Sequence, residues 1–233
     1  LSYSPDDKSV AAAGIGGNLY VFDAATGQSQ LETDAHNFGI SMVSWNRDGR
    51  FLTTAGQDGK IRLFDAGSFL EIETMFGGST WVECVRWSPH SDTFASTSGK
   101  RIRLWSSTGE LVREYPEQNS TVVDLAWSPI SEKFVTACYG GITQWRAENK
   151  IPVHRYEWKG STLVISWSPN GRYIATGDQD STVHFWITKN GKDLQMYGYP
   201  TKVKELSWDS TSRFLATGGG GHVTVWNCEP SPE

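Results

Sequence analysis

The sequence predicts an all-β protein built from six repeats of short antiparallel strands. Two series of aromatic residues recur along the 233-residue chain in steps of 40 to 42 residues. Between them, short apolar runs are separated by turns rich in Gly, Asp, Asn, Ser and Pro, and segments such as IRLF, IRLW and VTVW alternate apolar and polar positions. A period of two residues, β-branched and aromatic enrichment and closely spaced turn signals predict strands, and no window shows a convincing helical period.

The first aromatic series marks the first strand of each repeat. Most members stand at the head of a related phrase, such as WSPHS, WSPIS or WSPNG, in which the residues after the aromatic are typical of a turn. A short apolar run such as FLTTAG, TFASTS or YIATGD follows and predicts the second strand. The series consists of Tyr3, Trp45, Trp87, Trp127, Trp167 and Trp208.

The second aromatic series marks the third strand, and a polar turn after each member leads to a fourth strand-like run. Its members are Phe22, Phe64, Trp105, Trp145, Trp186 and Trp226. Together the two series contain nine of the 11 Trp residues, and only Trp81 and Trp158 fall outside them.

Four antiparallel strands repeated about every 40 residues are what a β-propeller blade requires, because one blade cannot bury both of its faces alone. We expect one propeller over residues 1–228, followed by a Pro-rich linker or tail at 229–233. The predicted blades are 1–35, 36–77, 78–117, 118–157, 158–198 and 199–228, the last without its outer strand. Since native proteins avoid an unpaired edge, we expect a longer parent protein that supplies the missing strand.

Composition excludes several classes of protein. The chain has 21 basic and 26 acidic residues, a net charge of -5, so it lacks the basic footprint of a nucleic-acid-binding protein. No apolar run is long enough to span a membrane. Cys84, Cys138 and Cys228 are odd in number and widely spaced, which favours a reducing compartment and a cytoplasmic location, with a nuclear one left open.

The phrases WSP on the first strand, TTAG or ATGD on the second, and DGKIRLFD or DSTVHFW on the third make Leu1–Cys228 similar to the WD-repeat (WD40) β-propeller family. Seven blades are the commonest number in that family, so the resemblance implies a seven-bladed ring in the longer parent, and a closed six-bladed ring is the alternative. The resemblance also implies a hydrogen-bonded network of a His before the first strand, a strand Ser or Thr, a turn Asp and the third-strand Trp. Four residues ahead of the first apolar position of a strand, where that His is expected, the chain has His36, Gly78, Gln118, Trp158 and Tyr199.

No repeat is predicted to carry the full network. The second repeat has His36, Thr54 and Asp58, but Phe64 replaces the Trp and has no N–H to donate. The fifth repeat has Thr176, Asp180 and Trp186, but Trp158 stands at the place of the His. We therefore expect packing and glycine turns to replace polar clamps.

A search for chemistry finds no convergent catalytic or metal-binding group. The five His residues lie in separate repeats without metal-ligand spacing, and the glycine strings join two strands instead of a strand and a helix. Lys100, Arg101 and Arg103 alternate with apolar residues, which we interpret as a solvated strand face. We predict no enzymatic activity, no cofactor and no metal. An enzyme using the central channel is a weaker hypothesis, with Glu83, Asp124 and Glu205 on separate repeats.

The predicted function is a protein-interaction scaffold that binds a peptide or domain. In the WD-repeat family the loops entering the first strands and the turns after the second strands form one interaction face. Projected onto this chain, that face contains His36, Phe38, Gln57, Asp58, Trp81, Lys100, Tyr139, Trp158, Gln179, Asp180, Tyr199 and Lys202. Trp and Tyr are typical of binding hot spots. The alternative is a regulatory or architectural module of a larger protein. The sequence names neither partner, pathway, organism nor oligomeric state.

Overall fold

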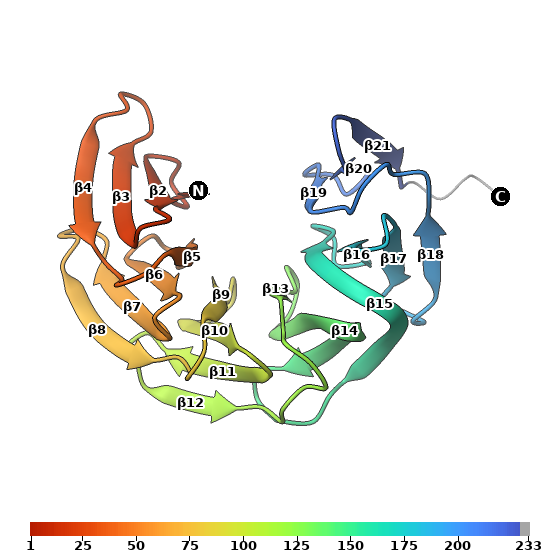
Figure 1. The fold of residues 1–233 in the computed structure, drawn as a ribbon, viewed down its shortest axis with the longest axis horizontal. Helices are drawn as coiled ribbons and strands as arrows, with labels where there is room; N and C mark the ends of the chain where they lie inside the picture. Colours follow the sequence, from red (N-terminus) through yellow and green to blue (C-terminus); the bar gives the residue numbers. More distant parts are fainter. Residues whose placement is uncertain (229–233) are drawn as a thin grey trace. The chain divides into compact units, whose positions relative to one another are not determined.

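The computed structural model describes residues 1–228, and it is all-β, as the sequence predicts (Figure 1). Its strands, β1 to β21, form five antiparallel sheets in the described part of the chain. The chain divides into two compact units, Leu1–Leu125 and the part that begins at Ala126. Among residues 1–228, no helix is long and apolar enough to cross a membrane. The predicted tail at 229–233 lies outside the described residues.

The first unit contains three four-stranded sheets whose strands are neighbours in the order of the chain. The first sheet contains β1 (Ser2–Tyr3), β2 (Ser9–Ala13), β3 (Asn18–Asp23) and β4 (Ser29–Asp34). The second contains β5 (Ile40–Trp45), β6 (Phe51–Gly56), β7 (Lys60–Asp65) and β8 (Glu71–Phe76). The third contains β9 (Val82–Trp87), β10 (Thr93–Ser98), β11 (Arg101–Ser106) and β12 (Leu111–Glu114).

Strand register explains the two aromatic series. In the third sheet Trp87 is directly opposite Phe94, and Phe94 is directly opposite Trp105. Directly opposed residues lie on the same face of a sheet, so the two series form one transverse row. The ring centroids of Trp87 and Phe94 are 4.8 Å apart, and those of Phe94 and Trp105 are 6.4 Å apart. A spacing of 40 to 42 residues therefore repeats the same packing row from one sheet to the next.

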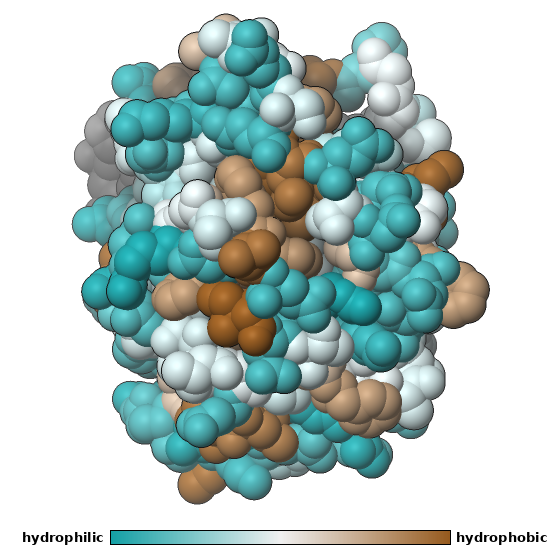
Figure 2. Space-filling view, turned by 90° about the vertical axis from the view of Figure 1, so that its left-hand side faces the viewer, coloured by the Kyte–Doolittle hydropathy of each residue, from teal (hydrophilic) through white to brown (hydrophobic). Residues whose placement is uncertain are grey.

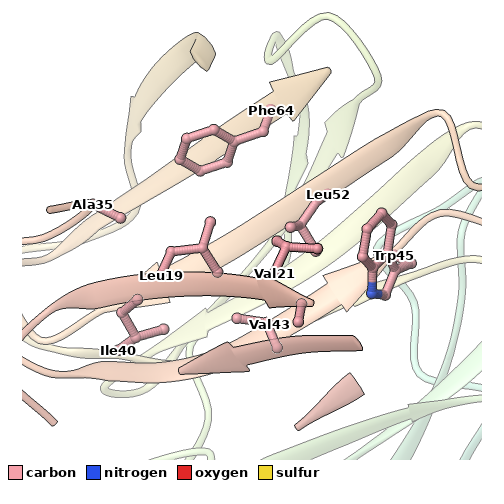
Figure 3. Close-up of a cluster of buried hydrophobic side chains, with 9 residues drawn as sticks. Leu19, Val21, Ala35, Ile40, Val43, Trp45, Leu52 and Phe64 are labelled. Carbon is pink, nitrogen blue, oxygen red and sulfur yellow. The ribbon is translucent and has the colours of Figure 1, made fainter. Parts of the chain in front are cut away.

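Within the first unit, the core lies between neighbouring sheets. Leu19 and Val21 of β3 are fully buried and belong to one cluster with Val43, Leu52 and other residues of the second sheet. Figure 3 shows these side chains directed toward one another from different strands. Each blade-like sheet thus buries its apolar face against the next sheet, as the repeat argument requires.

The second unit departs from the prediction. It contains one six-stranded sheet and one three-stranded sheet. The six-stranded sheet contains β13 (Asp124–Trp127), β14 (Lys133–Arg146), β15 (His154–Trp167), β16 (Tyr173–Asp178), β17 (Val183–Ile187) and β18 (Asp193–Met196). The three-stranded sheet contains β19 (Glu205–Trp208), β20 (Phe214–Gly218) and β21 (Val223–Asn227).

The expected fold of six separate blades in a seven-bladed ring is wrong, because the strands of two predicted repeats share a sheet. The reason is β15, which stays extended through the expected boundary at 157/158. Its first part pairs with β14, where Gln144 is opposite His154, and its last part pairs with β16, where Trp167 is opposite Ile174. Gly160 lies within this strand beside the Trp158 indole. A Cβ at residue 160 would lie 2.3 Å from Nε1 of Trp158, so the position leaves no room for a side chain. The residue boundaries of the individual blades stay a prediction.

Candidate functional site

The second sheet carries the part of the family's polar network that its residues allow, so a polar clamp is present here although packing and glycine turns were expected in its place. His36 Nδ1 lies 2.8 Å from an Asp58 carboxylate oxygen, and His36 Nε2 lies 2.8 Å from the Thr54 hydroxyl. Burial lowers the pKa of His36 and outweighs the opposing effect of Asp58, so the ring is neutral at pH 7. Nδ1–H then donates to Asp58, while Nε2 accepts from Thr54. Phe64 is buried at the position of the missing indole donor.

The Asp58 carboxylate is held in its charged form by this network. Burial alone would raise its pKa, but the hydrogen bond and charge interaction with His36, together with the backbone N–H groups of Lys60 and Asn37, bring it below its ordinary value. His36 and Asp58 were candidates for partner binding. Because both are engaged in this network and the His36 side chain is buried, they support the loops instead of offering free contacts.

In the three-stranded sheet, Tyr199 takes the place of the His. The Tyr199 hydroxyl lies 2.6 Å from the Thr217 hydroxyl and accepts a hydrogen bond of 2.8 Å from the indole N–H of Trp226. The sequence signal was available, because Tyr199 precedes Val203 by the four residues that separate His36 from Ile40. The spacing places Tyr199 at that position, but only the structure shows that it makes the hydrogen bonds of the His.

The fifth repeat uses Thr176 as expected, but the carboxylate is not the expected one. Asp180 lies in an exposed turn, where it accepts a hydrogen bond of 2.8 Å from Thr182. The buried carboxylate is that of Asp178, which accepts from Thr162 at 2.8 Å and from Thr176 at 3.4 Å. Burial raises the pKa of Asp178 to about 7, and the two hydroxyl donors oppose this only in part.

Trp158 also has a structural contact in this repeat. Its ring centroid lies 4.0 Å from that of His184, which is fully buried and stacks in turn beside Trp186. A half-buried indole that covers a buried ring is poorly placed as a free anchor for a partner. The sequence, which left Trp158 outside the two aromatic series, did not reveal this contact.

Several of the remaining candidates are well exposed. Phe38 is 62%, Trp81 57% and Tyr139 61% exposed. Phe38 and Trp81 belong to the first unit, and Tyr139 belongs to the second. Lys100, Gln179 and Lys202 are also exposed, while Gln57 is half-buried and its backbone N–H donates to the Gly39 carbonyl at 2.9 Å.

The loops of the first unit that carry Phe38 and Trp81 are each hydrogen-bonded to a turn of the preceding sheet. The turn at Gly14 is bound to the start of β5, since the Ile40 N–H donates to the Gly14 carbonyl at 3.2 Å. The Gly77 N–H donates to the Gly59 carbonyl at 2.9 Å, which joins the loop before β9 to the turn between β6 and β7. These backbone bonds hold the loops at one end of the three sheets, so their exposed side chains are presented from a rigid frame.

Ile15, fully exposed in the turn before β3, is an apolar residue that the sequence reasoning missed. It lies in the string GIGGN, which was interpreted only as a hairpin turn. Its neighbour Gly17 has φ +101, and a Cβ there would lie 1.9 Å from the His36 carbonyl, so the turn abuts the loop that carries Phe38. We call Ile15, Phe38 and Trp81 together the aromatic loop surface.

Two of the acidic residues named for the inner strands, Glu83 and Asp124, have partners. Glu83 accepts a hydrogen bond of 3.1 Å from the Gly99 N–H, and burial raises its pKa. Asp124 forms an ion pair of 3.1 Å with Arg86. Within residues 1–228 there is no group of three or more His, Cys, Asp or Glu residues that could hold a metal ion.

Comparison with known proteins gives one matching family, described as the IFT122 first beta-propeller, over residues 1–231. The chain is 26% identical over 234 residues to the APC/C activator protein CDC20 of Saccharomyces cerevisiae, with 97% of this chain and 32% of that protein covered. It is 32% identical over 92 residues to the WD repeat-containing protein slp1 of Schizosaccharomyces pombe, with 39% of this chain and 19% of that protein covered.

A third relative is the Actin-interacting protein 1 of Drosophila melanogaster, to which the chain is 31% identical over 102 residues. That match covers 42% of this chain and 17% of the relative. The chain thus spans about a third or less of the length of each of these three relatives.

Proposed function

Because this chain belongs to the IFT122 first beta-propeller family, we propose that it binds a partner protein through the aromatic loop surface of its first unit. The resemblance to WD-repeat propellers is confirmed by that match and by the relatives. Their names, an APC/C activator and an actin-interacting protein, describe proteins that act with other proteins, which supports an interaction module here. We propose no catalytic role for the chain itself.

The observation that carries the proposal is the exposure of Phe38 and Trp81 on backbone that is hydrogen-bonded in place. Complete burial of an aromatic side chain contributes about 1.5–3 kcal/mol, and a preorganised loop loses little entropy on binding. Both residue types carry large contact area, and Trp is among the commonest hot-spot residues. The partner is therefore expected to place an apolar segment across these loops.

We also propose an intracellular location. All three cysteines are free, and Cys84 and Cys138 are buried. Buried thiols without a disulfide are typical of proteins in a reducing compartment, which fits the cytoplasm and leaves the nucleus open.

The proposal is tested by site-specific photo-crosslinking. A benzoylphenylalanine at position 38 or 81 is expected to crosslink the partner in cells, and the double variant Phe38→Ala, Trp81→Ala is expected to lose its capture while folding normally. Trp158 is left unchanged, because its replacement would disturb the contact with His184.

A matched control comes from another apolar surface of the same unit. Figure 2 shows hydrophobic side chains near the middle of the face that carries the outer strands at the left of Figure 1. Leu70 and Ile72, beside and within β8, are 69% and 45% exposed. The variant Leu70→Ala, Ile72→Ala should keep partner capture. If the Phe38→Ala, Trp81→Ala variant still captures the partner and the Leu70→Ala, Ile72→Ala variant does not, the binding surface lies on β8 instead.

A second candidate function is a regulatory module for activity elsewhere in a longer protein. It is favoured by the coverage of CDC20, of which the match spans only 32%. The parent reading frame tests it directly, and a parent consisting of this chain alone contradicts it.

A further inference from the structure

A basic pocket lies beside Trp81 in the first unit, and nothing in the proposed function assigns it a ligand. The pocket has a volume of about 340 Å³ and lies between the loop before β9 and the start of β11. Its lining includes the side chains of Lys100, Arg101 and Arg103 together with Ser79 and Thr80. We propose that it binds a phosphorylated side chain of the partner peptide, an inference that rests on peptide binding by the aromatic loop surface.

Arg103 lines this pocket and is buried, so the prediction that it belongs to a solvated strand face is wrong. It is only 7% exposed, its Nε donates to Glu114 at 2.8 Å, and its Nη1 donates to the Gly77 carbonyl. The next residue, Gly78, stands at the position of the family's His. A Cβ there would lie 2.0 Å from the Ser98 hydroxyl, so the close approach of the loop to the strand requires glycine.

Glu117 already places a carboxylate at this pocket. Its Oε1 lies 3.0 Å from Arg101 Nε, and both side chains are about half exposed, at 59% for Glu117 and 49% for Arg101. An exposed ion pair of this kind stabilises little, because water and salt screen it. Arg101 Nη1 also lies 3.9 Å from a carboxylate oxygen of Glu114, so both carboxylates partly neutralise Arg101. Because Glu117 is exposed, a more highly charged anion can displace its carboxylate from Arg101.

A phosphoryl group fits the lining better than a carboxylate does. It carries about -1.5 to -2 charge at pH 7 and three acceptor oxygens. Lys100 is exposed and has no ion pair within residues 1–228, so its ammonium group is available beside Arg101. The hydroxyls of Thr80 and Ser98, 3.1 Å apart, belong to the lining of the same pocket and add neutral polar groups to it.

The surroundings favour a phosphopeptide over an anionic membrane. Trp81 directly follows Thr80 and is exposed, so a residue next to the phosphorylated one can pack on its ring. The chain as a whole carries a net charge of -5, which disfavours adsorption to an anionic lipid surface. The recognised unit is thus one phosphorylated residue with an apolar or aromatic neighbour.

The test is a titration of the full 233-residue chain, followed by NMR of the backbone amides. The probes are a pentapeptide with central phosphoserine and a neighbouring leucine, the same peptide with serine, and inorganic phosphate. The phosphopeptide is expected to shift the Ser79 and Gly99 amides and to bind at least tenfold more tightly than either other probe. The double variant Lys100→Glu, Arg101→Glu should lose this binding by more than tenfold.

Two further variants sharpen the test. Glu117→Gln removes the competing carboxylate and should tighten phosphopeptide binding by about two- to fivefold, a change that a purely structural role would not produce. Lys60→Glu is the matched control, because Lys60 begins β7 as Arg101 begins β11 and lies outside the pocket lining. It should leave the affinity unchanged.

Three results would overturn the proposal: no shift with the phosphopeptide, equal affinity for inorganic phosphate, or weaker binding by the Glu117→Gln variant. Shifts confined to the second unit would overturn it as well. The outcome is separable from that of the proposed function. If the Phe38→Ala, Trp81→Ala variant loses partner capture but the wild type does not bind the phosphopeptide, the proposed interaction surface is supported and only the phosphate site is refuted.

Discussion

The hydroxyl of Tyr199 lies 2.6 Å from the hydroxyl of Thr217, and this pair repeats in the last sheet what His36 and Thr54 do in the second. In both cases a residue of the loop entering the sheet is joined to the second strand of that sheet. In the last sheet the Trp226 indole completes the group with a hydrogen bond to Tyr199. A different side chain at the same position thus supplies the same connection between loop and strand.

Replacing this tyrosine should destabilise the second unit. Tyr199→Phe removes the hydroxyl from a half-buried network, and we expect the free energy of unfolding to fall by about 1–2 kcal/mol in urea denaturation. Trp226 keeps a 3.2 Å contact with Thr217, which limits the loss. Tyr197→Phe is the control, since Tyr197 is 68% exposed and should cost less than about 0.5 kcal/mol. Equal effects at both positions would contradict the structural role of Tyr199.

Asp178 should make the stability of the chain depend on pH. Its pKa is raised to about 7 in the folded state, so folding favours the protonated form. The stabilisation is fully present below pH 3.8, the ordinary pKa, and is lost as the pH rises through about 7. Asp178→Asn, which stays neutral, should therefore be more stable than the wild type at pH 8, by roughly 1–3 kcal/mol.

The measurement is the difference in melting temperature between the Asp178→Asn variant and the wild type from pH 4 to pH 8. The difference is expected to grow toward high pH. Asp180→Asn is the control, because Asp180 lies in an exposed turn. A pH-independent difference for Asp178→Asn would show that the carboxyl is not protonated in the folded state.

His36→Ala should destabilise the first unit by about 2–4 kcal/mol, because it leaves the Asp58 carboxylate and the Thr54 hydroxyl without their shared partner. Thermal unfolding of this variant can be compared with Asn37→Ala, which changes an exposed side chain in the same loop. A small effect at His36 would mean that packing alone holds the loop.

Acidification should also act through His36. Its pKa is lowered by burial, so the neutral ring favours the folded state. This stabilisation is present above pH 6.5, the ordinary pKa, and is lost as the pH falls. We expect the stability difference between the wild type and His36→Ala to shrink below pH 6, which a titration of the unfolding midpoint would detect.

Gly160 should tolerate no side chain while Trp158 is in place. A Cβ at residue 160 would lie 2.3 Å from Trp158 Nε1, so Gly160→Ala is expected to cost about 1–3 kcal/mol through overpacking. Adding Trp158→Ala should recover part of this loss, and the double-mutant cycle measures the coupling. Gly221→Ala is the control, because a Cβ there would meet no atom within 4 Å. Strict additivity would contradict the contact.

Much of the local structure is readable from the sequence. The alternation IRLW places β11, and the phrase WSPHS places the end of β9 and the turn after it. The family resemblance also identified His36, Thr54 and Asp58, which the structure joins by hydrogen bonds. The sequence failed in the fifth repeat, where Asp180 was assigned the role that Asp178 fills. Asp178 is the last residue of β16 and Asp180 lies only two residues later, so the local pattern does not distinguish them.

The candidate site was only partly predictable for a related reason. Phe38 and Trp81 were identified as candidates and are exposed, whereas Trp158 and Tyr199 were identified by the same argument and have internal contacts. An exposed aromatic residue and one with internal contacts give the same local sequence pattern in a loop. Its exposure depends on residues far along the chain, such as His184 beneath Trp158, which no local pattern reports.

By itself the sequence determined the strand content and the transverse aromatic rows, because both depend on short-range periodicity and on a repeat that is written in the chain. Only the tertiary structure decided how the strands group into sheets. The continuous β15 joins two predicted repeats because its backbone hydrogen bonds run to β14 on one side and to β16 on the other. Such pairing is a property of distant segments, and the free energy of a sheet depends on partners that local sequence does not specify.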